Sequence, residues 1–115
     1  MTNQLAEKIR FDIPSIEYKE ETLDNGLKIV MSRRGNIPMV AVNTTFHAGS
    51  KDEEEDKTGL AHLFEHLMFE GSPNIPKGKF DEILIHNGGD SNAYTSWDST
   101  SYFIALPSCH LETGL

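Results

Sequence analysis

Two histidines and a glutamate in the middle of the chain have the types and the spacing of a metal site that performs hydrolysis. His62 and His66 are four residues apart and Glu65 lies between them, in the pattern H-x-x-E-H. This is the inverted form of the commoner H-E-x-x-H zinc signature. On a helix, residues i and i+4 share a face, so both imidazoles can reach one metal ion. A carboxylate beside a metal-activated water can take its proton, which predicts metal-assisted hydrolysis with Glu65 as the base.

The residues around this motif favour the metal interpretation. Apolar side chains surround the three polar ones: Leu63, Phe64, Leu67, Met68 and Phe69. Histidine and glutamate in so apolar a helix are costly to bury without a partner, and one metal ion can serve all three. The alternative is a surface helix that carries a solvated histidine pair. We expect the helix to span about 58–70, after a solvated acidic loop, with Asp56 or Thr58 as its N-cap.

The composition indicates one small globular domain or a part of one. The chain has 115 residues, of which 37% are hydrophobic, and this permits a modest core. Its net charge of -8 argues against a nucleic-acid partner, because no basic stripe exists to neutralise phosphates. The single cysteine, Cys109, cannot form an internal disulfide. No stretch resembles a secretory signal or a transmembrane span, so we expect a cytoplasmic protein with no membrane contact.

Turn signals and hydrophobic periodicity predict the element order β-β-β-α-α-β-β, followed by the start of another helix. The expected strands span 18–22, 27–31, 39–46, 92–96 and 101–106, and the second helix spans about 77–87. Asn25-Gly26 is a hairpin signal between the first two strands, and Gly88-Gly89 ends the second helix. Clustered strands with two inserted helices predict an α+β fold, a largely antiparallel sheet with helices packed on one face.

Three blocks of the chain share a pattern that reaches well beyond H-x-x-E-H. They are DNGLKIV at 24–30, GLAHLFEHLMFEGS at 59–72 and GGDSNAYTSWDSTSYF at 88–103. In this order they resemble the opening hairpin, the zinc helix and the substrate strand of the pitrilysin/insulinase family of zinc metallopeptidases, which includes the mitochondrial processing peptidases. The resemblance covers nearly the whole chain after a polar N-terminal lead-in, 1–17. It implies that 18–115 is a partial N-terminal peptidase domain with a processing-peptidase-like metallohydrolase fold.

The resemblance also implies a role for particular residues. His62 and His66 match the family's zinc ligands, and Glu65 matches the general base that activates zinc-bound water. The segment at Asn92 and Ala93 matches the part of the family that holds an extended substrate against a sheet edge, as in β-augmentation. The implied cofactor is Zn2+, and the implied activity is that of a zinc-dependent metalloendopeptidase acting on peptides or small unfolded proteins.

One part of the family's pattern lies outside this sequence. The third zinc ligand of the family is a glutamate on a later helix, roughly 75 to 80 residues beyond the second histidine. Only 49 of the 115 residues follow His66, and Glu112 is too near to be that ligand. We therefore expect a truncated fragment that alone binds zinc weakly and shows little or no peptidase activity. Its expected partner is the remainder of the enzyme, or a second homologous domain or subunit, which closes the active site.

Two alternatives are a non-catalytic pseudo-peptidase subunit and a metal-dependent lyase. Pseudo-peptidase subunits usually lose part of the zinc motif, whereas this chain keeps all three residues. S-ribosylhomocysteine lyase also uses an H-x-x-E-H helix and completes its site with a cysteine, a role that Cys109 would take here. We expect the remaining histidines to be surface or packing residues: His47, His86 and His110. The aromatic residues of the last two strands are expected to pack in the core or across strands: Tyr94, Trp97, Tyr102 and Phe103.

Overall fold

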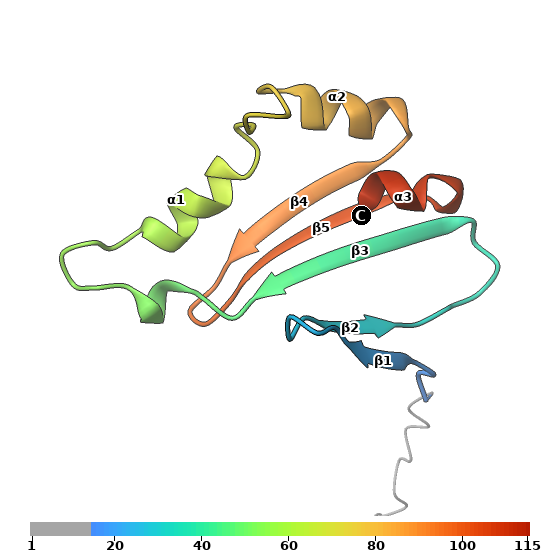
Figure 1. Cartoon of the computed structure of the whole chain (residues 1–115), viewed down its shortest axis with the longest axis horizontal. Helices are drawn as coiled ribbons and strands as arrows, with labels where there is room; N and C mark the ends of the chain where they lie inside the picture. Colours follow the sequence, from blue (N-terminus) through green and yellow to red (C-terminus); the bar gives the residue numbers. More distant parts are fainter. Residues whose placement is uncertain (1–14) are drawn as a thin grey trace, which may run out of the picture. The chain divides into compact units, whose positions relative to one another are not determined.

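The computed structural model of the chain describes residues 15–115 (Figure 1). It divides the chain into two compact units, one ending at Ile37 and the other spanning Pro38–Leu115. Most of the predicted lead-in, 1–17, lies outside the described residues, so its boundary with the peptidase domain stays a prediction. In residues 15–115, no helix has the length and the apolar character that a membrane span requires.

The first unit contains a two-stranded antiparallel hairpin. Strand β1 (Lys19–Thr22) pairs with β2 (Lys28–Met31). The turn is closed by the side chain of Asn25, whose Oδ1 accepts a 3.0 Å hydrogen bond from the backbone N–H of Leu27. Gly26 has a φ of 87°, a left-handed conformation that favours glycine. The hairpin predicted from Asn25-Gly26 is confirmed.

The second unit contains a three-stranded antiparallel sheet in the order β3-β5-β4 (Figure 1). Strand β5 (Thr100–Pro107) is central, because β3 (Met39–Phe46) pairs with it on one side and β4 (Asp90–Thr95) on the other. A tight turn joins β4 to β5, and in this turn the N–H of Ser96 donates to the carbonyl of Ser99 at 2.7 Å. Within the described residues β4 is therefore an edge strand.

The helices pack on one face of this sheet. They are α1 (Leu60–Leu67), α2 (Lys79–His86) and α3 (Leu111–Gly114), with two 3-10 turns, η1 (Ser50–Asp52) and η2 (Ser108–His110). Phe69, just after α1, lies against Tyr102, and Gly114 of α3 lies against Leu106. Tyr102 and Leu106 are four residues apart on β5, so their side chains leave the same face. The α+β fold with helices on one face is confirmed.

The apolar core of the described residues is small. Its buried apolar side chains are Leu84 and Leu106. Helix α1 has no buried residue, and only Ala61 and Glu65 of this helix are partly covered, one turn apart on the side that faces the sheet. Phe64 is 61% exposed. Apolar neighbours therefore do not bury the motif as expected, because a three-stranded sheet covers only one side of the helix.

The end of α2 is set by two glycines, as predicted from Gly88-Gly89. Gly88 adopts a left-handed φ of 69°, and its N–H donates to the carbonyl of Ile85 at 3.0 Å. The N–H of Gly89 donates to the carbonyl of Leu84 at 2.9 Å. These two bonds form a Schellman motif, which satisfies the last carbonyls of the helix and turns the chain into β4.

A close backbone contact at Gly49 holds η1 against the turn between β4 and β5. The N–H of Ser50 donates to the carbonyl of Ser96 at 3.1 Å, and the N–H of Lys51 donates to that of Trp97 at 2.8 Å. A Cβ on Gly49 would lie 2.6 Å from both of these carbonyl oxygens. Gly49 has an extended φ of -153°, which any residue adopts, so the requirement for glycine here is purely steric.

We predict that Gly49→Ala lowers the free energy of unfolding by about 3 kcal/mol, because an added methyl group meets backbone atoms that cannot rotate away and two hydrogen bonds are lost. The matched control is Gly78→Ala. Gly78 has a φ of 78° with nothing within 4 Å of a Cβ, so only the left-handed conformation is penalised, by about 1 kcal/mol. Urea unfolding measures both losses, and equal losses would contradict the steric account.

Candidate metal centre

Helix α1 brings the two histidines of the motif together. The Nε2 atoms of His62 and His66 are 3.0 Å apart, and the ring centroids are separated by 4.7 Å. Both side chains are exposed. This closeness follows from the helix itself, because residues four apart lie one above the other on the same face.

The histidine pair fits two positions of a tetrahedral zinc site. Zinc binds imidazole nitrogen at about 2.0–2.1 Å, so two such ligands on tetrahedral zinc are roughly 3.3 Å apart. The observed Nε2–Nε2 distance of 3.0 Å is close to this value. The same distance suits a hydrogen bond between the two rings. The fit to zinc therefore rests also on the chemistry of the two imidazole nitrogens, which are common zinc ligands. His62 and His66 are thus the residues of this chain that would hold a zinc ion.

The described residues do not complete such a site by themselves. Between residues 15 and 115, no three His, Cys, Asp or Glu side chains form a group that could hold a metal ion. Cys109 is distant from the histidine pair. Glu65 contacts Thr95, which pairs with Thr100 at the start of β5. Cys109 follows the other end of that strand. An eight-residue strand spans roughly 26 Å. The structure therefore gives Cys109 no part in this site.

Glu65 is held by Thr95, a residue that the sequence motifs do not single out. The hydroxyl of Thr95, the last residue of β4, donates a hydrogen bond to Oε2 of Glu65. Tyr102 lies in the same region, and its pKa is raised by burial and, to a smaller extent, by the negative charge of Glu65. Strand alternation is the signal that points to Thr95, because this residue shares a face with Ala93, two positions earlier.

An open hollow of about 580 Å³ lies beside the motif, between α1 and the end of β4. His62, Glu65 and Ala93 line it, together with Trp97 of the β4–β5 turn. Trp97 is 72% exposed, so the expectation that it packs within the sheet is wrong. Its position at the tip of a turn, beyond the end of the paired strands, leaves the indole in solvent.

The structure separates Asn92 and Ala93, the two residues expected to bind substrate. Ala93 lines the hollow, whereas Asn92 is exposed and does not. Successive side chains of a strand point to opposite faces, so the side chain of Asn92 leaves the face opposite to that of Ala93. The Oδ1 atom of Asn92 instead accepts a 2.9 Å hydrogen bond from the N–H of Ala93. Asn92 therefore acts on the backbone of the edge strand and not through the hollow.

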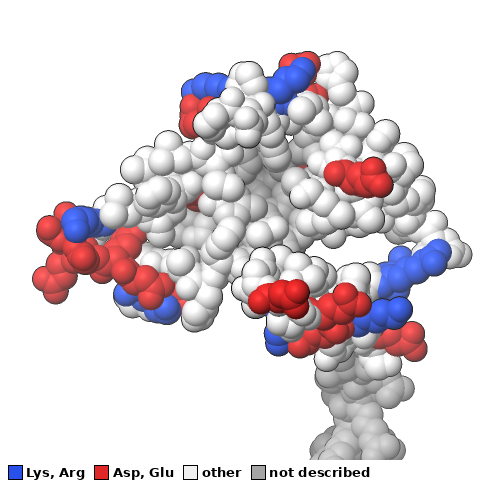
Figure 2. Space-filling model, viewed as in Figure 1, with Lys and Arg blue, Asp and Glu red and all other residues white. Residues whose placement is uncertain are grey.

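The acidic loop before α1 supplies the cap of the helix. The carboxylate of Glu53 accepts hydrogen bonds from the N–H groups of Gly59 and Ala61, at 2.7 and 2.8 Å. The predicted caps, Asp56 and Thr58, are wrong, because Gly59 occupies the N-cap position. The two backbone donors hold the pKa of Glu53 below its ordinary value of 4.5. Acidic side chains crowd this loop at the left of Figure 2. Among them, Glu53 has a structural role as the cap of α1.

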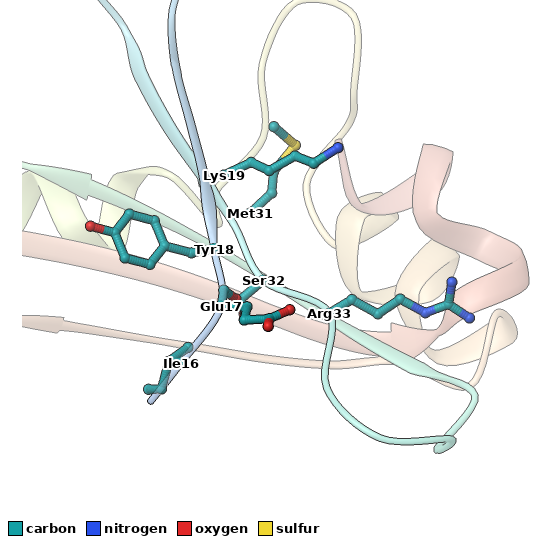
Figure 3. Close-up of a pocket in the computed structure, with 7 residues that line it drawn as sticks. All are labelled: Ile16, Glu17, Tyr18, Lys19, Met31, Ser32 and Arg33. Atoms are coloured by element: carbon teal, nitrogen blue, oxygen red, sulfur yellow. The ribbon is translucent and has the colours of Figure 1, made fainter. Parts of the chain in front are cut away.

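A second hollow, of about 780 Å³, lies beside the β1–β2 hairpin (Figure 3). Tyr18, Lys19, Met31 and Arg33 are among the residues that line it. Figure 3 shows the side chains of Tyr18 and Arg33 extending in opposite directions, so they do not converge on a common point. This hollow is larger than the one beside α1, but it has neither histidine nor cysteine in its lining and offers no comparable chemistry.

Comparison with known proteins identifies the family. The sequence profile of the insulinase family, described as Insulinase (Peptidase family M16), matches residues 28–115. This match covers most of the chain, which therefore belongs to the insulinase family. The resemblance inferred from the three sequence blocks is confirmed.

Relatives and one solved structure agree with this assignment. Zinc protease PqqE of Helicobacter pylori is 37% identical over 100 residues, which are 86% of this chain and 22% of that protein. Human insulin-degrading enzyme is 31% identical over 100 residues, which are 86% of this chain and 10% of the enzyme. The crystal structure of a protease from Helicobacter pylori has a TM-score of 0.81 at 37% identity and covers 85% of this chain.

The chain spans only part of these proteins. It covers 22% of zinc protease PqqE, 10% of human insulin-degrading enzyme and 24% of the crystallised protease chain. Probable zinc protease PqqL of Escherichia coli is 40% identical over 91 residues. This match covers 74% of this chain and 10% of that protein. Three of these four proteins are named as proteases, and two of the names specify zinc.

We predict that Glu53→Gln destabilises the protein at neutral pH and that this loss fades in acid. A carboxyl group whose pKa is lowered by folding stabilises the folded state above its ordinary pKa, here 4.5. That contribution disappears as the pH falls through the lowered value. Urea unfolding from about pH 3 to 7 should show the difference between wild type and variant shrinking below pH 4.5. Glu55→Gln, in the same loop, is the control, and a pH-independent loss in Glu53→Gln would contradict the assignment.

Proposed function

We propose that this chain is the metal-binding N-terminal part of a zinc metalloendopeptidase that hydrolyses peptide bonds in peptides or small unfolded proteins. The observation that carries the proposal is the geometry of α1, where the Nε2 atoms of His62 and His66 are 3.0 Å apart and Glu65 lines the same hollow as His62. Membership of the insulinase family supports it. A cytoplasmic location stays a prediction from the sequence.

Glu65 is the proposed general base. His62 and His66 would hold the zinc ion, which when bound would supply Lewis-acid assistance to the scissile carbonyl and to the attacking water. The carboxylate of Glu65 takes the proton from the attacking water and then passes it to the leaving amine. Glu65 is partly covered by the sheet yet open to the hollow, so its carboxylate is held in place and still accessible to a substrate.

The free edge of β4 is the proposed binding site for the peptide backbone. Antiparallel pairs alternate between hydrogen-bonded and non-hydrogen-bonded, and Ser96 and Ser99 form a bonded pair at the turn. The pairs with β5 alternate from there, so Thr95 and Ala93, one and three residues before Ser96, both belong to non-hydrogen-bonded pairs. Ala93 therefore directs its N–H and C=O away from β5. An extended peptide can pair with these groups through its own backbone, which gives affinity with little demand on sequence.

The remainder of the enzyme is the proposed partner. The third zinc ligand, a glutamate by resemblance to the family, comes from sequence beyond this chain or from a second domain or subunit. Leu63, Phe64 and Met68 of the α1 region are exposed by 50%, 61% and 61%. Figure 2 shows few charged side chains over α1 and the neighbouring strands in this view. An apolar surface next to the site suits contact with that partner.

We predict that Glu65→Gln, made in the complete enzyme, keeps its zinc but loses peptide cleavage by a factor of about 100 or more, because glutamine cannot accept the proton. Zinc is measured by elemental analysis and cleavage with a fluorogenic peptide. Glu70→Gln, just beyond the same helix, is the control and should stay active. Equal cleavage by wild type and Glu65→Gln would contradict the base assignment. A wild-type enzyme that binds zinc without cleaving any peptide would favour the pseudo-peptidase alternative.

We also predict that Cys109→Ser leaves the affinity for zinc unchanged, whereas His66→Ala lowers it by at least tenfold, a difference of about 1.4 kcal/mol. The reason is that Cys109 is at the opposite end of β5 from the histidine pair. Calorimetric titration of each variant with zinc measures the affinities. Weaker binding by Cys109→Ser would support the lyase alternative instead.

A further inference from the structure

A side-chain hydrogen bond joins Glu65 of α1 to the sheet. The hydroxyl of Thr95 donates a hydrogen bond to Oε2 of Glu65, in a partly buried setting. Residues 90–95 alternate between exposed and partly covered, and Thr95 is on the covered side with Ala93 and Ser91. The contact spans 30 residues of sequence and connects two different elements. It is therefore a tertiary contact and not a product of helix geometry.

We propose that Thr95 is the positioning residue of the catalytic base: its hydroxyl holds Oε2 of Glu65 and thereby leaves Oε1 directed to the attacking water. The inference rests on the proposed role of Glu65 as general base. Among residues 15–115 no side chain or backbone group donates a hydrogen bond to Oε1. The two carboxylate oxygens thus have separate tasks, one fixed by the sheet and one open to substrate chemistry.

The base needs such a support because α1 gives it little packing. Glutamate has several freely rotating bonds, and ordering a side chain of this kind costs up to about 2 kcal/mol. No residue of α1 is buried, so neighbouring side chains do not fix the rotamer of Glu65. A general base acts only within hydrogen-bond reach of the proton that it takes, and a displacement of about 1 Å lowers the rate severely.

Thr95 is suited to this task because the sheet fixes it in turn. A β-branched side chain has few rotamers at χ1, so the position of its hydroxyl follows from that of the strand. Thr95 pairs with Thr100, whose buried hydroxyl donates to the carbonyl of Ala48 at 2.9 Å. Ser96, the next residue, is held by the N–H of Ser50. The end of β4 is thus tied to both β5 and η1.

The test compares three variants of the complete, zinc-loaded enzyme. Thr95→Val has nearly the same shape but no donor, and Thr95→Ser keeps the donor. Thr45→Val is the control, because Thr45 shares a 2.9 Å hydrogen bond with Ser101 on the opposite face of the same sheet. We expect Thr95→Val to lower kcat by about tenfold or more with KM and zinc content unchanged, and Thr95→Ser to stay within about threefold of wild type. Thr45→Val should keep the wild-type kcat.

Crystal structures of the same variants give a readout that does not depend on activity. Glu65 should keep its position in Thr95→Ser and leave it in Thr95→Val. An unchanged Glu65 in Thr95→Val, or a wild-type kcat, overturns the inference. Loss of zinc from Thr95→Val also overturns it, because a general disturbance of the site would then explain the loss of activity.

Glu65→Gln separates this inference from the proposed function. If Glu65→Gln is inactive while Thr95→Val is fully active, only the role of Thr95 is wrong. If Glu65→Gln cleaves peptides at the wild-type rate, Glu65 is not the base, and both the proposed function and the role of Thr95 fall. Loss of cleavage in Glu65→Gln and Thr95→Val, with activity kept in Thr95→Ser, supports both.

Discussion

The pairing of β5 with β3 on one side and β4 on the other is the interaction on which the rest of the second unit depends. Residues 47–89, which contain α1 and α2, form one long connection between β3 and β4. Strand β5 brings the two ends of this connection together by pairing with both strands. This pairing places Thr95 within hydrogen-bond distance of Glu65 and the β4–β5 turn in contact with Gly49. Because α1 has no buried residue, these contacts determine where the motif lies, together with the packing of Phe69 on Tyr102 just after the helix.

Features that depend on neighbouring residues were predictable from the sequence. The hairpin at Asn25-Gly26, the helix end at Gly88 and the element order all follow from local conformational preferences. The closeness of His62 and His66 was equally predictable, because it needs only one turn of helix. The family resemblance added the family and its fold, both of which the comparisons confirm.

Features that depend on distant residues were not predictable. The contact of Thr95 with Glu65 joins positions 30 residues apart, and its recognition needs the register of the sheet as well as the alternation of the strand. Glu53 caps α1 from six and eight residues upstream, because the chain enters the helix through a left-handed glycine.

The hydrogen bond from the N–H of Ala93 to the side chain of Asn92 has a consequence for solubility. An unpaired strand edge next to an apolar helix surface is a template for aggregation, since any second copy of the chain can add its own strand there. The Asn92 amide occupies one of the outward donors and so competes with a strand that pairs only weakly. The side chain of Asn92 thus makes this edge a poorer template for the stacking of copies of the chain.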